Sequence, residues 1–207
     1  MPGRLHLITD TRFGRDPLAI LPAALDAGVD VVQVRIKDLC DRDVHAMTER
    51  VVEMCAQTGA TCVVDDRLDV ALTAGASGVH LGAEDLPVAA ARKFAGDGFV
   101  IGATVRDPPG AIAAAAAGAS YLGVGPSFAT ATKAGLPAPI GAAGVGAVCA
   151  VVSVPVIAIG GICADRVPAL VKAGAHGIAV VDAVSGADDP ASAVRELLAA
   201  LATALEQ

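Results

Sequence analysis

The chain has 207 residues, a length that suits one compact domain and is short for two. Hydrophobic residues make up 54% of the chain and aromatic residues only 2%, so we expect a core of aliphatic side chains. A formal net charge of −7 argues against a nucleic-acid-binding surface, because phosphate backbones are held by clustered Lys and Arg. We predict one domain over residues 1–207 with no nucleic-acid partner.

Short runs rich in Val, Ile and Leu alternate with Ala- and Leu-rich stretches of helical character. The runs are continuous, as expected for parallel strands covered on both faces. Asp-Pro pairs beginning at Asp16, Asp107 and Asp189 are typical helix starts, and repeated Ala-Gly-Ala or Ala-Gly-Val phrases mark helix ends. Strand then helix, eight times over, predicts an α/β protein with a single (β/α)8 TIM barrel rather than an open sheet. The predicted strands are Leu5–Thr9, Val31–Arg35, Thr61–Val64, Gly78–Leu81, Phe99–Thr104, Tyr121–Val124, Val156–Ile159 and Gly177–Val181.

Residues 134–164 carry no charge and are longer than a membrane span. Prolines, single glycines and the pair Gly160-Gly161 interrupt them, so we predict a loop, a helix, a strand and a turn there, and no membrane partner. The amino terminus shows no signal-peptide pattern, and we expect a cytoplasmic location. The five cysteines form no CxxC pair and are expected to be reduced thiols.

The chemistry of such barrels lies at the carboxyl ends of the strands. After the second predicted strand, alternation places Gln33, Arg35 and Lys37 on one face. Two cations pointing into a barrel mouth indicate a polyanion such as a phosphate or diphosphate. The alternative is that both side chains extend into solvent at a strand end.

Carboxylates follow the third and fourth predicted strands, at Asp65, Asp66 and Asp85. Carboxylates from neighbouring strands can meet, and beside cations they suit a Mg²⁺ that keeps some waters and binds substrate phosphate oxygens. The structural alternative is that Asp66 and Asp85 cap helices.

The fifth and sixth predicted strands lead into hydroxyl-bearing segments. Thr104 ends the fifth strand, and a loop of small residues after the sixth contains Thr130, Thr132 and Lys133. Such a loop can close over a ligand, or it can be a flexible surface crossing.

A glycine pair, Gly160-Gly161, follows the seventh predicted strand. Two glycines let backbone N–H groups approach an anion, and a plain tight turn is the alternative. Of the histidines in strands, His6 and His80 have no obvious carboxylate or Ser partner in the sequence. The site therefore indicates charge placement without a strong base or nucleophile.

Taken in order and spacing, these strand ends carry a set of short motifs that covers nearly the whole chain. The motifs are Leu7-Ile8-Thr9-Asp10, Gln33-Val34-Arg35-Ile36-Lys37, Asp65-Asp66-Arg67, Gly78-Val79-His80-Leu81-Gly82, Glu84-Asp85-Leu86-Pro87, Gly123-Val124-Gly125-Pro126, Thr130-Ala131-Thr132-Lys133 and Ala158-Ile159-Gly160-Gly161-Ile162. The set resembles the thiamine-phosphate synthase family. That family is a (β/α)8 barrel that joins a hydroxymethylpyrimidine diphosphate to a thiazole phosphate, with Mg²⁺, and releases pyrophosphate.

The resemblance implies a transferase of thiamine biosynthesis that works by a dissociative, Mg²⁺-assisted substitution. It also implies site roles. The residues implied to contact the pyrimidine diphosphate are Gln33, Arg35, Lys37, Asp65, Thr104 and Lys133, with Arg35, Lys37 and Lys133 as the catalytic cations. The implied Mg²⁺ ligands are Asp66 and Asp85. The residues implied to receive the thiazole phosphate are Thr130, Thr132, Gly160, Gly161, Val181 and Asp182.

Three positions depart from the family pattern. Asp65 stands in place of the usual Asn, which replaces a donor-acceptor amide with an acceptor. Ala83 stands in place of a common Gln. Asp182 stands where the family often supplies Ser or a backbone donor to the thiazole phosphate, and a carboxylate there should repel a phosphate by ~1 kcal/mol or more unless it is paired or turned away.

Other functions remain as alternatives. A thiazole tautomerase with the same barrel needs no diphosphate or metal, a phosphate-ligand sensor would bind without turnover, and a related enzyme would act on another phosphorylated heterocycle. The aliphatic outer helices allow a homo-oligomer without requiring one.

Overall fold

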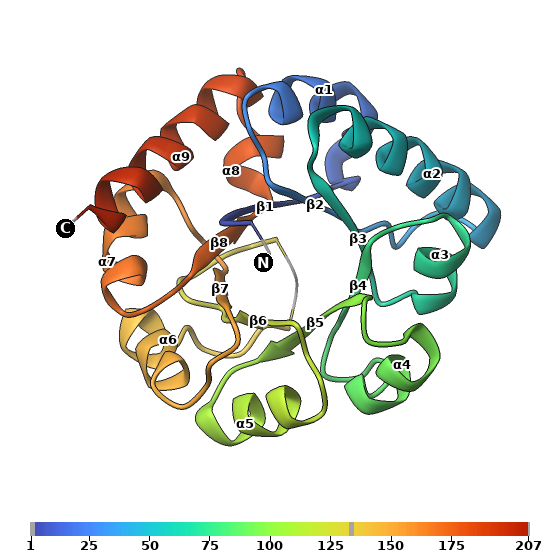
Figure 1. The fold of residues 1–207 in the computed structure, drawn as a ribbon. Helices are drawn as coiled ribbons and strands as arrows, with labels where there is room; N and C mark the ends of the chain where they lie inside the picture. Colours follow the sequence, from blue (N-terminus) through green and yellow to red (C-terminus); the bar gives the residue numbers. More distant parts are fainter. Residues whose placement is uncertain (1–2, 133–134, 207) are drawn as a thin grey trace.

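The computed structural model describes residues 3–132 and 135–206. Eight parallel strands form a closed barrel in which each strand pairs with its neighbours in sequence and the last pairs with the first (Figure 1). Each observed strand lies within one residue of the predicted one at either end, so the predicted (β/α)8 fold is confirmed. The strands are β1 (Leu5–Ile8), β2 (Val31–Val34), β3 (Thr61–Asp65), β4 (Gly78–Leu81), β5 (Val100–Val105), β6 (Tyr121–Val124), β7 (Val156–Ile159) and β8 (Gly177–Val180).

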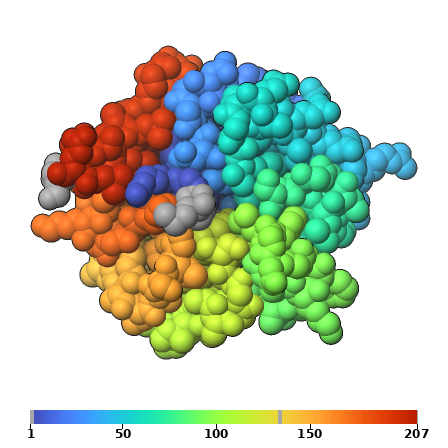
Figure 2. All heavy atoms as spheres, in the orientation of Figure 1, coloured from blue at the N-terminus to red at the C-terminus, as the bar shows by residue number. Residues whose placement is uncertain are grey.

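Helices form the outer layer, and successive segments follow one another around the perimeter (Figures 1 and 2). The predicted Asp-Pro starts are confirmed, because Asp16, Asp107 and Asp189 each accept a hydrogen bond from a first-turn backbone N–H. No helix in the described ranges is long and apolar enough to cross a membrane. The α-helices are α1 (Pro17–Asp26), α2 (Asp41–Thr58), α3 (Leu68–Thr73), α4 (Val88–Ala95), α5 (Pro108–Ala116), α6 (Gly141–Cys149), α7 (Val167–Lys172), α8 (Asp182–Ser185) and α9 (Pro190–Leu205), with 3-10 turns η1 (Arg12–Gly14) and η2 (Ala164–Arg166).

The apolar core lies mainly between the barrel and the helices. Alternation along β1 shows how the layers divide: Leu5 and Leu7 pack in the outer core, whereas His6 and Ile8 face the barrel interior. A smaller apolar cluster, which includes Ile8 and Tyr121, occupies the interior. Polar side chains also line this interior, which opens into a cavity.

Candidate active site

One cavity of about 940 Å³ is lined by residues from all eight strands and from the segments that follow β2 to β8. Every predicted site residue within the described ranges lines it, and Lys133 lies outside those ranges. The lining candidates are Gln33, Arg35, Lys37, Asp65, Asp66, Asp85, Thr104, Thr130, Thr132, Gly160, Gly161, Val181 and Asp182.

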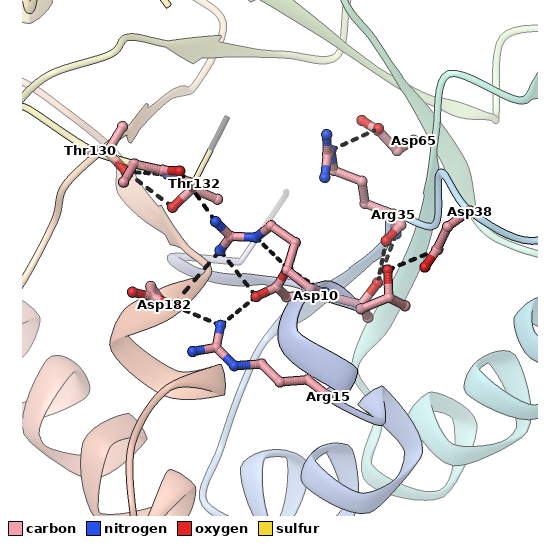
Figure 3. Close-up of polar contacts among 12 residues, drawn as sticks. Asp10, Arg15, Arg35, Asp38, Asp65, Thr130, Thr132 and Asp182 are labelled. Carbon is pink, nitrogen blue, oxygen red and sulfur yellow. Dashed lines mark hydrogen bonds and ion pairs between the residues drawn. The ribbon is translucent and has the colours of Figure 1, made fainter. Parts of the chain in front are cut away.

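Asp65 lies at the centre of the first group of contacts. Its Oδ1 accepts a hydrogen bond from Gln33 Nε2 at 2.8 Å, and its Oδ2 lies 3.1 Å from Lys37 Nζ. The same Oδ2 lies 3.4 Å from Arg35 Nε (Figure 3). An amide and two cations therefore satisfy the carboxylate that replaces the family's Asn. Because a carboxylate only accepts, the Gln33 amide nitrogen must face it, which leaves the amide oxygen of Gln33 as its remaining acceptor.

Lys37 also forms an ion pair with Asp66. Burial alone would lower the pKa of Lys37, but the hydrogen bond with Asp66 and the charge of Asp65 outweigh it and raise the pKa above its ordinary value. Lys37 is therefore a full cation at neutral pH, held between two carboxylates.

Asp66 and Asp85 form a hydrogen-bonded carboxylate pair. Asp66 lies in the left-handed region, at φ 62°, which is unfavourable for a residue with a Cβ and common at functional turns. Burial raises the pKa of Asp85, and a hydrogen bond with Asp66 raises it further. Burial also opposes ionisation of Asp66, but its contacts with Asp85 and Lys37 hold its pKa below the ordinary value. Asp85 accepts from the Gly82 backbone N–H at 2.6 Å.

Neither carboxylate caps a helix in the described structure, so the capping alternative is wrong: α3 follows Arg67 and α4 follows Pro87, both without a side-chain cap. In the part of the chain that the structure describes, no group of three or more His, Cys, Asp and Glu side chains is arranged to hold a metal. The pair could therefore supply oxygens from only two carboxylates to a cation, and waters or substrate oxygens would complete its shell, as Mg²⁺ commonly requires.

A buried polar chain that the sequence did not reveal supports Thr104. His80 Nδ1 lies 2.9 Å from the Tyr121 hydroxyl, and His80 Nε2 lies 2.9 Å from Thr104 Oγ1. Burial lowers the pKa of His80 and raises that of Tyr121, so both groups are neutral. We assign the Tyr121 hydroxyl as the donor to Nδ1, which makes Nε2–H the donor to Thr104 and leaves the Thr104 hydroxyl free to donate into the cavity.

Glycines make room for this chain. A Cβ at Gly102 would lie 2.3 Å from the Tyr121 ring and 2.4 Å from His80 Nδ1, and one at Gly123 would lie 2.9 Å from the His80 ring. The adjacent strand positions are therefore restricted to glycine by the side chains that they accommodate.

Gly160 and Gly161 serve a close approach of the loop that follows β6. A Cβ at Gly160 would lie 2.8 Å from Pro126, and one at Gly161 would lie 2.3 Å from the Ala129 carbonyl oxygen. Both glycines have positive φ, at 99° and 61°. The pair thus fits a tight turn against the loop, and the same turn borders the cavity.

The charged cluster Asp10, Arg12, Arg15 and Asp182 is the second feature that the sequence did not reveal. Asp10 accepts from Arg12 at 2.7 and 3.0 Å and from Arg15, and Arg15 Nη1 donates to Asp182 Oδ1 at 2.7 Å (Figure 3). Burial would raise the pKa of Asp10, but the hydrogen bonds from both arginines hold it below its ordinary value. Asp182 is therefore paired, which is the condition under which it can lie near a phosphate.

A signal for this cluster exists in the sequence, because Asp10, Arg12 and Arg15 follow the first strand at its carboxyl end. The pairing with Asp182 cannot be predicted from a sequence pattern, because it depends on the contact between β1 and β8 that closes the barrel.

Comparison with known proteins gives consistent results. Residues 5–184 match the family model described as thiamine monophosphate synthase. The chain is 56% identical over 202 residues to thiamine-phosphate synthases of Salinispora tropica and Salinispora arenicola, covering 96% of this chain and 97% of each relative. Its fold superposes on thiamine phosphate pyrophosphorylase from Pyrococcus furiosus with a TM-score of 0.90 at 36% identity, covering 98% of this chain and 96% of that one.

Proposed function

Since the chain belongs to the thiamine monophosphate synthase family, we propose that its cavity joins a hydroxymethylpyrimidine diphosphate to a thiazole phosphate. The chain is a transferase of thiamine biosynthesis that acts on small phosphorylated substrates. The finer proposal is carried by one observation: cations, a carboxylate pair and a hydroxyl donor line one cavity of about 940 Å³.

Gln33, Arg35, Lys37 and Thr104 form the proposed site of the pyrimidine diphosphate. The amide oxygen left free on Gln33 can accept a hydrogen bond from an exocyclic amine, such as the pyrimidine carries. Arg35 and Lys37 supply positive charge for the diphosphate, and Thr104 supplies a neutral donor. Lys133, next to the described Thr132, is the further cation expected from the resemblance.

The charge balance supports a divalent cation at this end of the cavity. Arg35 and Lys37 face the three carboxylates Asp65, Asp66 and Asp85, so without a bound cation their positive charge is neutralised and little is left to attract a diphosphate. We propose that Asp66 and Asp85 hold Mg²⁺ there. Hard carboxylate oxygens suit this ion, and its charge, when bound, would neutralise the diphosphate as a leaving group.

The proposed reaction breaks the bond between the pyrimidine methylene carbon and the diphosphate oxygen and forms a bond from that carbon to the thiazole nitrogen. The diphosphate leaves with the bonding electron pair, and the nitrogen attacks with its own lone pair. No proton is removed from the nucleophile, which agrees with the neutral, hydrogen-bonded His80. Catalysis then consists of stabilising the leaving group and positioning the second substrate.

Thr130, Thr132, Gly161, Val181 and Asp182 form the proposed site of the thiazole phosphate, beside the first substrate in the same cavity. The Thr130 hydroxyl donates to Thr132 Oγ1 at 3.0 Å, so the loop presents two linked hydroxyls. Residues 1–207 are proposed to act as one catalytic domain. A cytoplasmic location and a homo-oligomer stay predictions from the sequence.

The test is pyrophosphate release from purified protein given both substrates, with and without Mg²⁺ and with each substrate omitted. Release that requires both substrates and the metal is expected. Conversion of a thiazole phosphate tautomer without metal would favour the tautomerase. Thermal protection by either substrate without release would favour a sensor or another heterocycle.

A further inference from the structure

We propose that Arg12 and Arg15 bind the phosphate of the second substrate, and that Asp182 competes with this phosphate for the two guanidinium groups. This inference rests on the proposed function, because it assigns residues to the thiazole phosphate. It adds two cations from the β1–α1 segment to a site otherwise built from hydroxyls, backbone and a carboxylate.

Asp10 anchors the two arginines. Its side chain is only 1% exposed, and it accepts both Arg12 Nε and Arg12 Nη2 as well as Arg15. The Arg12 backbone N–H also donates to Asp10, at 3.2 Å. A buried carboxylate with this many donors is a fixed part of the fold, so it holds the guanidinium groups in place whether or not a ligand is bound.

Asp182 contacts the same arginines from the solvent side. Its Oδ1 lies 2.7 Å from Arg15 Nη1 and 3.7 Å from Arg12 Nη2, but its side chain is 62% exposed. An exposed ion pair contributes little to stability and exchanges readily for another anion. Asp10 is therefore the permanent partner of the arginines, and Asp182 is the replaceable one.

Arg12 also reaches the loop that is proposed to bind the second phosphate. Arg12 Nη1 donates to the Ala131 carbonyl oxygen at 3.3 Å, between Thr130 and Thr132 (Figure 3). Asp182, Thr130 and Thr132 line the same cavity. A phosphate oxygen in the place of the Asp182 carboxylate would thus meet two guanidinium groups, and Arg12 links this position to the loop that carries the two hydroxyls. Guanidinium and hydroxyl groups are the donor types that phosphates prefer.

Charge explains why Asp182 competes. The two arginines are balanced by Asp10 and Asp182, so no positive charge is left over for a phosphate. With Ser at position 182, which the resemblance gives as the common residue, one positive charge would remain. Asp182 therefore weakens binding of the second substrate without removing its binding groups.

The inference is tested by steady-state kinetics on the variants Arg12→Gln, Arg15→Gln and Asp182→Ser. For each variant, the concentration of 4-methyl-5-(2-phosphooxyethyl)thiazole is varied in one series and that of its unphosphorylated alcohol in another. Loss of either arginine should raise KM for the phosphorylated thiazole about 10-fold or more. The alcohol should be used as well by the variants as by the wild type, and KM for the pyrimidine diphosphate should not change. Arg195→Gln, an exposed position on α9 with the same change in net charge, is the matched control.

Asp182→Ser should lower KM for the thiazole phosphate about 5-fold. Because Asp182 is exposed, this variant is expected to fold even if an arginine variant does not. Arginine variants that affect the phosphate and the alcohol equally, or an Asp182→Ser variant with an unchanged or higher KM, would overturn the inference.

Calorimetric titration of the thiazole phosphate onto each variant separates this inference from the proposed function. Wild-type protein that releases no pyrophosphate would refute the proposed function. The order of binding affinities, with Asp182→Ser above wild type and both arginine variants below it, would still support the arginine site, and equal affinities would refute it.

Discussion

Replacing Lys37 with Ala should separate catalysis from stability. The Lys37 side chain is 48% exposed, so its ion pairs with Asp65 and Asp66 are partly screened by water. Exposed pairs contribute about 0–1 kcal/mol to folding, and the melting temperature should fall by no more than about 4 °C. In the reaction the same ammonium group is proposed to stabilise the leaving diphosphate, and removal of one such group typically lowers kcat by about 10²- to 10³-fold, or about 3–4 kcal/mol.

The assay is pyrophosphate release at saturating substrates, with urea unfolding of the same preparations. Lys93→Ala is the matched control, because Lys93 is exposed in the last turn of α4 and its loss changes net charge equally. The control should keep wild-type kcat. A Lys37→Ala variant with wild-type kcat would refute the assignment of this cation. A variant whose free energy of unfolding falls by as much as its activation free energy rises would show that the ion pairs are mainly structural.

Two further predictions follow from the perturbed acid groups. Burial and the hydrogen bond with Asp66 raise the pKa of Asp85, so the folded protein disfavours the charge of this carboxylate. The Asp85→Asn variant should therefore keep or slightly raise the melting temperature at pH 7, while its pyrophosphate release should no longer respond to Mg²⁺. A retained response to Mg²⁺ would contradict the assignment of Asp85 as a metal ligand. Burial lowers the pKa of His6 to about 4 from 6.5, so on acidification the unfolded chain binds a proton at this histidine before the folded protein does. The free energy of unfolding is therefore unaffected by His6 above about pH 6.5 and declines by up to about 3 kcal/mol as the pH falls towards 4. Urea unfolding at pH 7.5 and 4.5 should show a smaller decline for His6→Gln, and an equal decline would assign the acid sensitivity to other groups.

The barrel was predictable from sequence because local chemistry determines most of it. Continuous apolar runs gave the strands, and the Asp-Pro pairs gave helix starts that the caps confirm. Alternation correctly placed Gln33, Arg35 and Lys37 along the cavity. These features depend on residues that are close in sequence or on the general rule that strand ends meet at one face.

The pairing of side chains was not predictable in the same way. Asp182 meets Arg15 only because β8 closes against β1, and His80 meets Tyr121 and Thr104 only because β4, β5 and β6 are neighbours in register. The sequence shows no obvious carboxylate or Ser partner for His80, and its observed partners, Tyr121 and Thr104, are of other types and lie on neighbouring strands. Which of several compatible groups pair is decided by register and rotamer, and a single-sequence pattern does not contain either.

The two acidic departures from the family pattern have different consequences because they differ in exposure. Asp65 has a side chain that is 11% exposed and is held by Gln33, Arg35 and Lys37, so its charge belongs to the resting site and increases the need for a bound cation there. Asp182 is largely exposed and held on one side by arginines, so its charge can be displaced. Asp65→Asn should therefore raise the Mg²⁺ concentration needed for half-maximal activity, because it removes negative charge that attracts the ion, whereas Asp182→Ser should leave it unchanged. Equal metal dependence in both variants would show that local charge at Asp65 does not govern metal binding.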